Sequence, residues 1–149
     1  MAHDCEICEQ FPRMTADNPY FIAGLESGYA VLGWNQIYPG YTLFLSKTCA
    51  PELHDLPPDT RARFLEEMAI VAEAVFRAFS PRKLNYELLG NSVTHLHWHL
   101  FPRYAGDPNP QWPIWNNEAY LRAPRRTPIE PERLAEMRAR VQRALSELR

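Results

Sequence analysis

The spacing of apolar side chains predicts short strands in the first half of the chain. Two β-favouring runs, residues 21–23 and 29–32, are separated by the turn residues Gly24 and Gly28 and predict a hairpin. A turn-rich link then leads into a third predicted strand over residues 41–46.

Two further runs predict a second pair of strands. Residues 84–89 and 94–103 have strand-like patterns, and only the short loop 90–92 lies between them. A connection this short favours antiparallel neighbours.

Two other segments repeat apolar residues every three or four positions, which is the period of a helix with one buried face. The first begins at Pro57-Pro58, where proline is tolerated in a first turn, and ends before Ser80-Pro81. The second follows the acidic residues Glu130 and Glu132, which suit a helix N-terminus. The apolar positions are Phe64, Leu65, Met68, Val71, Ala72, Val75, Phe76 and Phe79 in the first helix, and Leu134, Met137, Val141, Leu145 and Leu148 in the second.

Prolines dominate the segment that precedes the last helix. Seven of the fourteen prolines lie between Pro102 and Pro131, which excludes helix or central strand for most of this length. The segment also holds Trp112, Trp115 and Tyr120, so we expect an ordered, extended arm that packs on the domain or on a partner subunit. Two interpretations of Trp112 and Trp115 are open: one of them forms a wall of the binding pocket, or both are ordinary packing residues.

Length, composition and charge then limit the classes of protein. The 149 residues fit one domain, with a core over 1–105, the arm over 106–131 and the last helix over 132–149. A net charge of −2 gives no excess of positive charge that would attract duplex nucleic acid or an anionic membrane. No stretch approaches the apolar length of a transmembrane helix, and residues 1–6 lack the features of a signal peptide. We therefore expect a cytoplasmic protein.

Histidine spacing gives the strongest chemical signal. His95, His97 and His99 occupy every second position, so a strand would place their imidazoles in one row and turn Leu96, Trp98 and Leu100 toward the core. Imidazole serves as a metal ligand, a general acid–base or a nucleophile. The alternative is a polar strand face that happens to be rich in histidine.

The loop before this row favours a binding role. Gly90 allows close backbone approach to a ligand, and Asn91 and Ser92 offer short groups suited to phosphate oxygens. A histidine-rich face alone does not account for that loop.

Cys5 and Cys8 form a Cys-x-x-Cys pair near the N-terminus. A redox motif would normally follow a strand and open a helix, but no strand precedes this pair. The spacing also suits half of a zinc site, which requires two more ligands. Because three cysteines are a poor disulfide framework, the remaining alternative is reduced thiols that pack as small hydrophobic groups.

The run 95–101 matches the His-φ-His-φ-His-φ-φ signature of the histidine triad (HIT) family of nucleotide hydrolases and transferases. Residues 39–45 resemble the start of the family's Pro-Gly-His strand, and residues 52–56 lead into a helix, as in the family. The resemblance covers about residues 5–105. It implies an α+β, HIT-like fold: an antiparallel sheet of about five strands with one long helix packed on it and a C-terminal helix. It also implies a homodimer.

The resemblance further implies a structural zinc site. Many bacterial relatives bind zinc through a Cys-x-x-Cys pair, a histidine that follows a lysine after the second strand, and the first triad histidine. Here Cys49 stands where the histidine that follows the lysine is expected. The implied ligands are therefore Cys5, Cys8, Cys49 and His95. His54 is a weaker substitute, and the alternative is that the site has been lost.

The same resemblance assigns roles in catalysis. It makes His97 the nucleophile that attacks the α-phosphorus of a purine nucleotide, and His99 a donor to the phosphate oxygens and the leaving group. His95 or a backbone carbonyl would hold the His97 ring, and no metal is required for the chemistry. Asn91 and Ser92 would contact the phosphate. Asn35 would hold the ribose, or it is an ordinary turn asparagine.

The implied activity is hydrolysis, since the family's transferase branch has glutamine at the third position, where this chain has His99. The implied substrates are dinucleoside polyphosphates of the diadenosine tetraphosphate type or nucleoside phosphoramidates. The alternative is a nucleotide- or metal-binding module that retains the triad without turnover.

Overall fold

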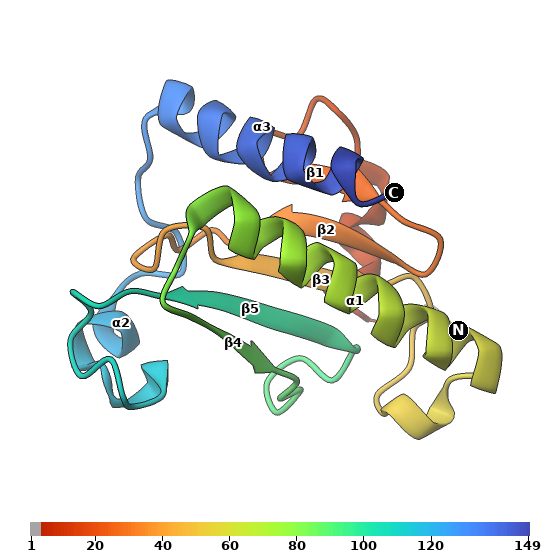
Figure 1. The fold of residues 1–149 in the computed structure, drawn as a ribbon. Coiled ribbons are helices and arrows are strands. Elements are labelled where there is room, and N and C mark those ends of the chain that lie inside the picture. The colour runs from red at the N-terminus through yellow and green to blue at the C-terminus, as the bar shows by residue number, and fades with distance from the viewer. Residues whose placement is uncertain (1–3) are drawn as a thin grey trace.

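A computed structural model of the protein describes residues 4–149. Five strands form one antiparallel sheet in the order β1-β2-β3-β5-β4, and the long helix α1 crosses one face of it (Figure 1). The α+β class and the five-stranded sheet are confirmed. The strands are β1 (Phe21–Gly24), β2 (Gly28–Leu32), β3 (Thr42–Ser46), β4 (Lys83–Glu87) and β5 (His97–Arg103). The helices are η1 (Cys8–Arg13), η2 (Leu53–Asp55), α1 (Pro58–Phe79), η3 (Ile114–Asn116), α2 (Glu118–Arg122) and α3 (Pro131–Glu147).

The core lies between α1 and the sheet. Phe64, Val71 and Val75 of α1 are buried against sheet residues such as Phe44 and Leu100, because alternation turns every second strand side chain toward the helix. The helix ends where Ser80 adopts a left-handed backbone, with φ of 47°, and donates its amide proton to the carbonyl of Phe76. This termination matches the predicted stop at Ser80-Pro81.

Helix α3 packs beside α1 and over β1 (Figure 1). Its buried stripe includes Leu134, Met137 and Val141, which belong to the same core cluster as α1. The apolar period predicted for this segment therefore marks the face that α3 buries within the chain.

The connection between β4 and β5 is longer than the pattern predicts. Strand β4 ends at Glu87 and β5 begins only at His97. The chain makes a detour before β5: the carbonyl of Leu96 still accepts from the amide of Ser46, in register with the β3–β5 pairing, but the amide of Leu96 donates to the carbonyl of Ala50, beyond the end of β3. These bonds draw the chain toward the end of β3 and bury His95 before β5 begins.

The proline-rich arm is not wholly extended, because it forms the short helices η3 and α2. Asn117 begins α2 by accepting from the backbone amides of Ala119 and Tyr120 at 3.0 and 3.4 Å. The arm stays proline-rich on both sides of this turn, so the helices remain short.

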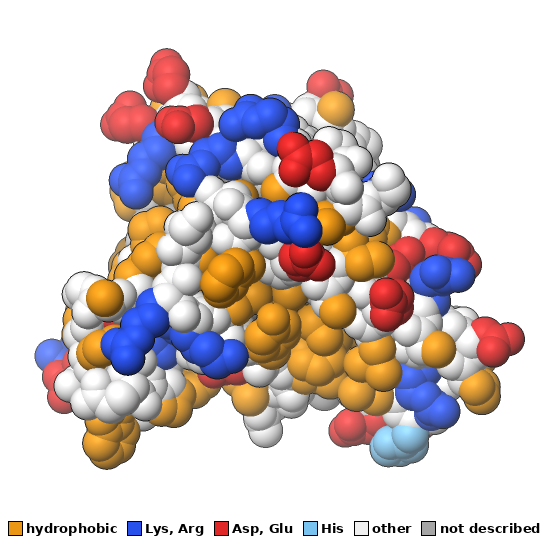
Figure 2. Space-filling model, viewed as in Figure 1, with side chains coloured by type: hydrophobic (Ala, Val, Ile, Leu, Met, Phe, Trp, Pro, Cys, Tyr) orange, Lys and Arg blue, Asp and Glu red, His pale blue; other side chains and the backbone are white. Residues whose placement is uncertain are grey.

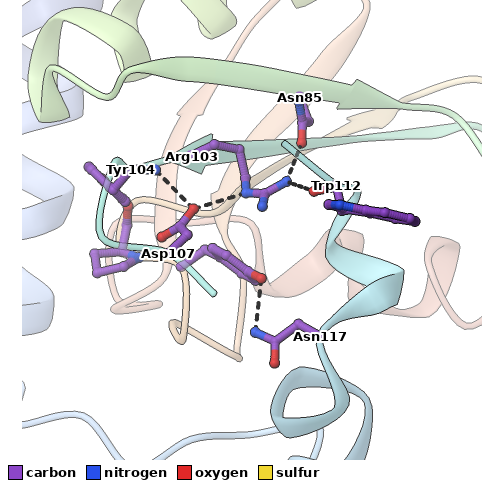
Figure 3. A network of polar contacts seen from close by, with 8 residues as sticks. Asn85, Arg103, Tyr104, Asp107, Trp112 and Asn117 are labelled. Atoms are coloured by element: carbon purple, nitrogen blue, oxygen red, sulfur yellow. Dashed lines mark hydrogen bonds and ion pairs between the residues drawn. The ribbon is translucent and has the colours of Figure 1, made fainter. Parts of the chain in front are cut away.

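A buried polar network fastens the arm to the sheet (Figure 3). Arg103 at the end of β5 pairs with Asp107 at 3.0 Å and donates to the side chain of Asn85 and the carbonyl of Trp112 at 2.8 and 2.7 Å. Asn117 donates to the hydroxyl of Tyr38 at 2.9 Å. Since Arg103 and Asn117 are buried, these contacts hold the arm against the sheet in one position.

Across residues 4–149, no helix combines the length and the apolar character needed to cross a bilayer.

Candidate functional site

Two of the three predicted histidines share the sheet face that α1 leaves open. His97 lies opposite Leu45, and His99 lies between Leu43 on β3 and Glu87 on β4. Their imidazole centroids are 4.7 Å apart, and the ring planes meet at 66°. The alternation of β5 therefore brings these two rings together on one surface.

Both rings line a pocket of about 610 Å³ on this face. The β2 and β3 strands provide apolar floor residues such as Val31 and Leu43, η1 and the loop after it border one part, and the arm borders another. The remaining residues that line it include Glu6, Ile7, Glu9, Gln10, Met14, Asn18, Tyr20, Trp34, Asn35, Tyr41, Trp115, Tyr120, Leu121 and Arg125.

The hydrogen bond of His97 defines which of its nitrogens is free. Nδ1 lies 2.6 Å from the backbone carbonyl oxygen of His95, which can only accept. Nδ1 therefore carries the proton, and Nε2 keeps its lone pair. Of the two partners considered for His97, the backbone carbonyl rather than the His95 ring holds it.

His99 is packed among aromatic rings. Its Nδ1 lies 2.6 Å from the hydroxyl of Tyr41, and its ring is nearly parallel to those of Tyr41 and Phe101. Burial, and to a smaller extent the neighbouring His97, lowers the pKa of His99 to about 4. At pH 7 this imidazole is neutral.

His95 departs from the row and joins the cysteines. Its Nε2 lies 2.7 Å from the carbonyl oxygen of Ser46, so Nε2 carries the proton and the Nδ1 lone pair is free. Nδ1 lies 3.3 Å from Sγ of Cys5 and 3.5 Å from Sγ of Cys8. Burial lowers the pKa of His95, although the hydrogen bond to Ser46 opposes this shift.

The structure brings together all four residues of the predicted zinc set. The Sγ atoms of Cys5, Cys8 and Cys49 and one ring nitrogen of His95 lie within 4.8 Å of one another. That spacing, and a free imidazole lone pair directed at the thiols, fits tetrahedral coordination by three sulfurs and one nitrogen. His54 is not in this group, because its ring lies 3.8 Å from Asp55 on the surface.

The cysteine thiols differ in their tendency to ionise. Burial raises the pKa of Cys5, but hydrogen bonds from the Cys8 backbone amide and the neighbouring thiols outweigh it, so the net shift is downward. Burial, followed by the proximity of Cys5, raises the pKa of Cys8 to about 12. A cation bound among the three sulfurs would reverse that upward shift.

The predicted substrate-binding residues are only partly brought together. Asn35 lines the pocket and is buried, while its Oδ1 accepts from the backbone amide of Ile37 at 3.0 Å. Asn91 and Ser92 are exposed and lie outside this pocket, and Val93 lines it instead. Ser92 borders a smaller cavity beside the cysteines, because the loop follows the detour toward β3.

Of the two tryptophans of the arm, Trp115 lines the pocket and Trp112 does not. The sequence analysis missed Tyr41 as a site residue, although it stands in place of the histidine of the Pro-Gly-His pattern. Trp34 and Arg125 also line the pocket, but they carried no recognisable signal because separate segments meet there only in the fold.

Similarity to known proteins points to one family. The family model described as "HIT domain" matches residues 20–106. "Protein hit" of Bacillus subtilis is 30% identical over 81 residues, which are 51% of this chain and 56% of that protein, so the match spans little more than half of the relative. A crystal structure of a histidine triad protein from Marinobacter aquaeolei superposes with a TM-score of 0.73 at 26% identity, and the match covers 87% of this chain and 90% of that chain. A Zn-bound histidine triad family protein from Mycobacterium smegmatis shares the fold, with a TM-score of 0.64 at 23% identity over 97% of this chain and 95% of that chain.

Proposed function

Because this chain belongs to the HIT domain family, we propose that it hydrolyses purine nucleotides at the α-phosphate through a covalent nucleotidyl-histidine intermediate. The candidate substrates are dinucleoside polyphosphates of the diadenosine tetraphosphate type and nucleoside phosphoramidates. Both present the same α-phosphorus to the pocket and differ in the group that leaves.

The observation that carries this proposal is the free Nε2 of His97. The carbonyl of His95 fixes the proton on Nδ1, so the nitrogen that remains holds a lone pair beside the pocket. In the first step Nε2 bonds to phosphorus, and the bond to the leaving group breaks with its electron pair. In the second step water attacks phosphorus, the P–N bond breaks, and the nucleoside monophosphate is released.

The rest of the pocket suits a nucleotide. Met14, Tyr20 and Val31 offer an apolar surface for a purine ring. His99 lies beside His97 and is the donor proposed for a phosphate oxygen. We keep Asn35 as the ribose contact, and Asn91 and Ser92 as phosphate contacts that require the loop 90–92 to approach the pocket.

We also propose that the Cys5, Cys8, Cys49 and His95 group holds a structural zinc ion. The ion would supply no step of the reaction. Its residues hold the N-terminal segment against β3 and fix His95, whose backbone carbonyl orients His97. Because thiolate ligands require reduced cysteines, a cytoplasmic location is part of this proposal.

A homodimer is proposed from the free edge of the sheet. Strand β4 is an edge strand, and Tyr86 on it and Leu65 and Phe76 on α1 are 48%, 38% and 43% exposed. Figure 2 shows apolar side chains gathered on this side of the molecule. A second copy that pairs with β4 would cover both the unpaired backbone groups and these side chains.

Turnover of a substrate panel tests the function. Wild-type protein should release AMP from diadenosine tetraphosphate, from an adenosine phosphoramidate, or from both, and His97→Ala should abolish release while nucleotide binding persists. The matched control is His54→Ala, because His54 has a side chain that is 79% exposed and lies outside the pocket. Binding without AMP release by the wild type would favour a non-catalytic nucleotide-binding module, and turnover by His97→Ala would exclude His97 as the nucleophile.

A further inference from the structure

A largely buried phenol and an imidazole meet in the wall of the pocket. The hydroxyl of Tyr41, just before β3, lies 2.6 Å from Nδ1 of His99 in β5. The rings of Tyr41 and Phe101 stack at 4.0 Å between centroids, and His99 lies nearly parallel to both at about 6 Å. This stack fixes the orientation of the His99 ring.

The direction of this hydrogen bond follows from the partners of the hydroxyl. Within residues 4–149, the structure gives the Tyr41 hydroxyl no other hydrogen-bond partner than Nδ1 of His99. If Nδ1 carried the proton, the phenolic proton would be buried without an acceptor, which is unfavourable. Burial also raises the pKa of Tyr41 well above its usual range, so the phenol keeps its proton. The hydroxyl therefore donates, and Nδ1 accepts.

The two pocket histidines then have opposite tautomers. His97 has its proton on Nδ1 and a lone pair on Nε2, whereas His99 has its lone pair on Nδ1 and its proton on Nε2. No protein group in the described part of the chain hydrogen-bonds to Nε2 of His99, and the residue lines the pocket. One ring offers an electron pair to the pocket and its neighbour offers an N–H.

We propose that Tyr41 is a positioning residue that selects the Nε2–H tautomer of His99 and so makes it a donor to a phosphoryl oxygen of the bound substrate. The catalytic meaning of this assignment rests on the proposed function, but the tautomer itself does not. Without the hydroxyl, the His99 proton could move to Nδ1, and Nε2 would then present a lone pair to an anionic phosphate.

The pKa of His99, lowered by burial to about 4, agrees with this arrangement. A neutral ring can accept from Tyr41 and donate from Nε2 at the same time, whereas a protonated ring could not accept. His99 therefore acts as a hydrogen-bond donor without a net charge.

Nitrogen NMR tests the tautomer directly. The full chain is labelled with ¹⁵N-histidine, and His99→Gln identifies the His99 signals by their loss. Wild-type protein at pH 7 should show a pyridine-type Nδ1 and a pyrrole-type Nε2 for His99. Tyr41→Phe should shift that signature toward the other tautomer or toward a mixture. A pyrrole-type Nδ1 in the wild type, or an unchanged signature in Tyr41→Phe, would overturn the proposal.

Kinetics provide the second readout. Tyr41→Phe should lower kcat about tenfold, the value of one lost hydrogen bond, while KM changes less than about twofold. Tyr38→Phe is the matched control, because this tyrosine belongs to the same cluster and its buried hydroxyl bonds to Asn117 rather than to a triad residue. Equal losses of kcat in the two variants would count against Tyr41. If no nucleotide is turned over, the proposed function fails while the NMR result still decides the tautomer.

Discussion

Replacing His99 by glutamine should remove a measurable part of the acid sensitivity of folding. The ordinary pKa of histidine is 6.5, and in the folded protein burial lowers that of His99 to about 4. Below pH 6.5 the unfolded chain therefore binds a proton that the folded protein rejects. The stabilisation is fully present above pH 6.5 and is lost as the pH falls through about 4.

The size of the effect follows from this difference. The fall of the His99 pKa from 6.5 to about 4, at ~1.36 kcal/mol for each tenfold change in the binding constant, corresponds to about 3 kcal/mol lost between pH 7 and pH 4. Glutamine keeps a polar group beside the Tyr41 hydroxyl but does not titrate. The stability of His99→Gln should therefore fall by about 3 kcal/mol less than that of the wild type over the same range.

Urea unfolding at several pH values between 4 and 7 measures this difference. Constant ionic strength and a chelator keep metal binding from contributing, and the other titrating groups cancel because both proteins contain them. If the two proteins lose the same free energy of unfolding, within about 0.5 kcal/mol, the pKa of His99 is not depressed by burial and the reasoning is wrong.

Three further predictions concern other parts of the molecule. Glu67→Ala should lower the free energy of unfolding by about 3 kcal/mol, since the buried Glu67 carboxylate accepts from the amides of Glu26 and Ser27 at 3.0 and 2.8 Å and both would lose their partner; the exposed neighbour Glu66→Ala is the control, and equal losses by urea unfolding would contradict this role. Cys49→Ser should reduce zinc content from near one ion per chain and lower the thermal midpoint, as measured by elemental analysis and calorimetry; wild-type protein that is metal-free after purification in zinc would refute the site. Phe76→Glu should convert a dimer into a monomer by light scattering, whereas Arg133→Glu on the exposed face of α3 should not; a wild-type monomer at high concentration would remove the dimer proposal.

The sequence determines most of the local structure because periodicity and turn chemistry are local properties. The helix from Pro58 to Phe79 and its stop at Ser80-Pro81 follow from apolar spacing and the restriction that proline imposes on the residue before it. The hairpin of β1 and β2 follows from two β-favouring runs that the turn residues Gly24 and Gly28 separate. The every-second-residue spacing likewise places His97 and His99 on one face.

The tertiary structure decides what each of those side chains meets. Periodicity puts His95 in the same row, yet its ring lies with three cysteines. Its Nε2 donates to the carbonyl of Ser46, and just after it the amide of Leu96 bonds to Ala50, beyond the end of β3. The histidine pattern likewise gives no indication that the hydroxyl of Tyr41 bonds to His99, since these two residues are 58 positions apart in the sequence. The spacing of residues within a strand determines which face of the sheet a side chain occupies. Only the tertiary fold brings donors and acceptors from distant parts of the sequence within hydrogen-bond distance, and those contacts set the tautomer and charge of each imidazole ring.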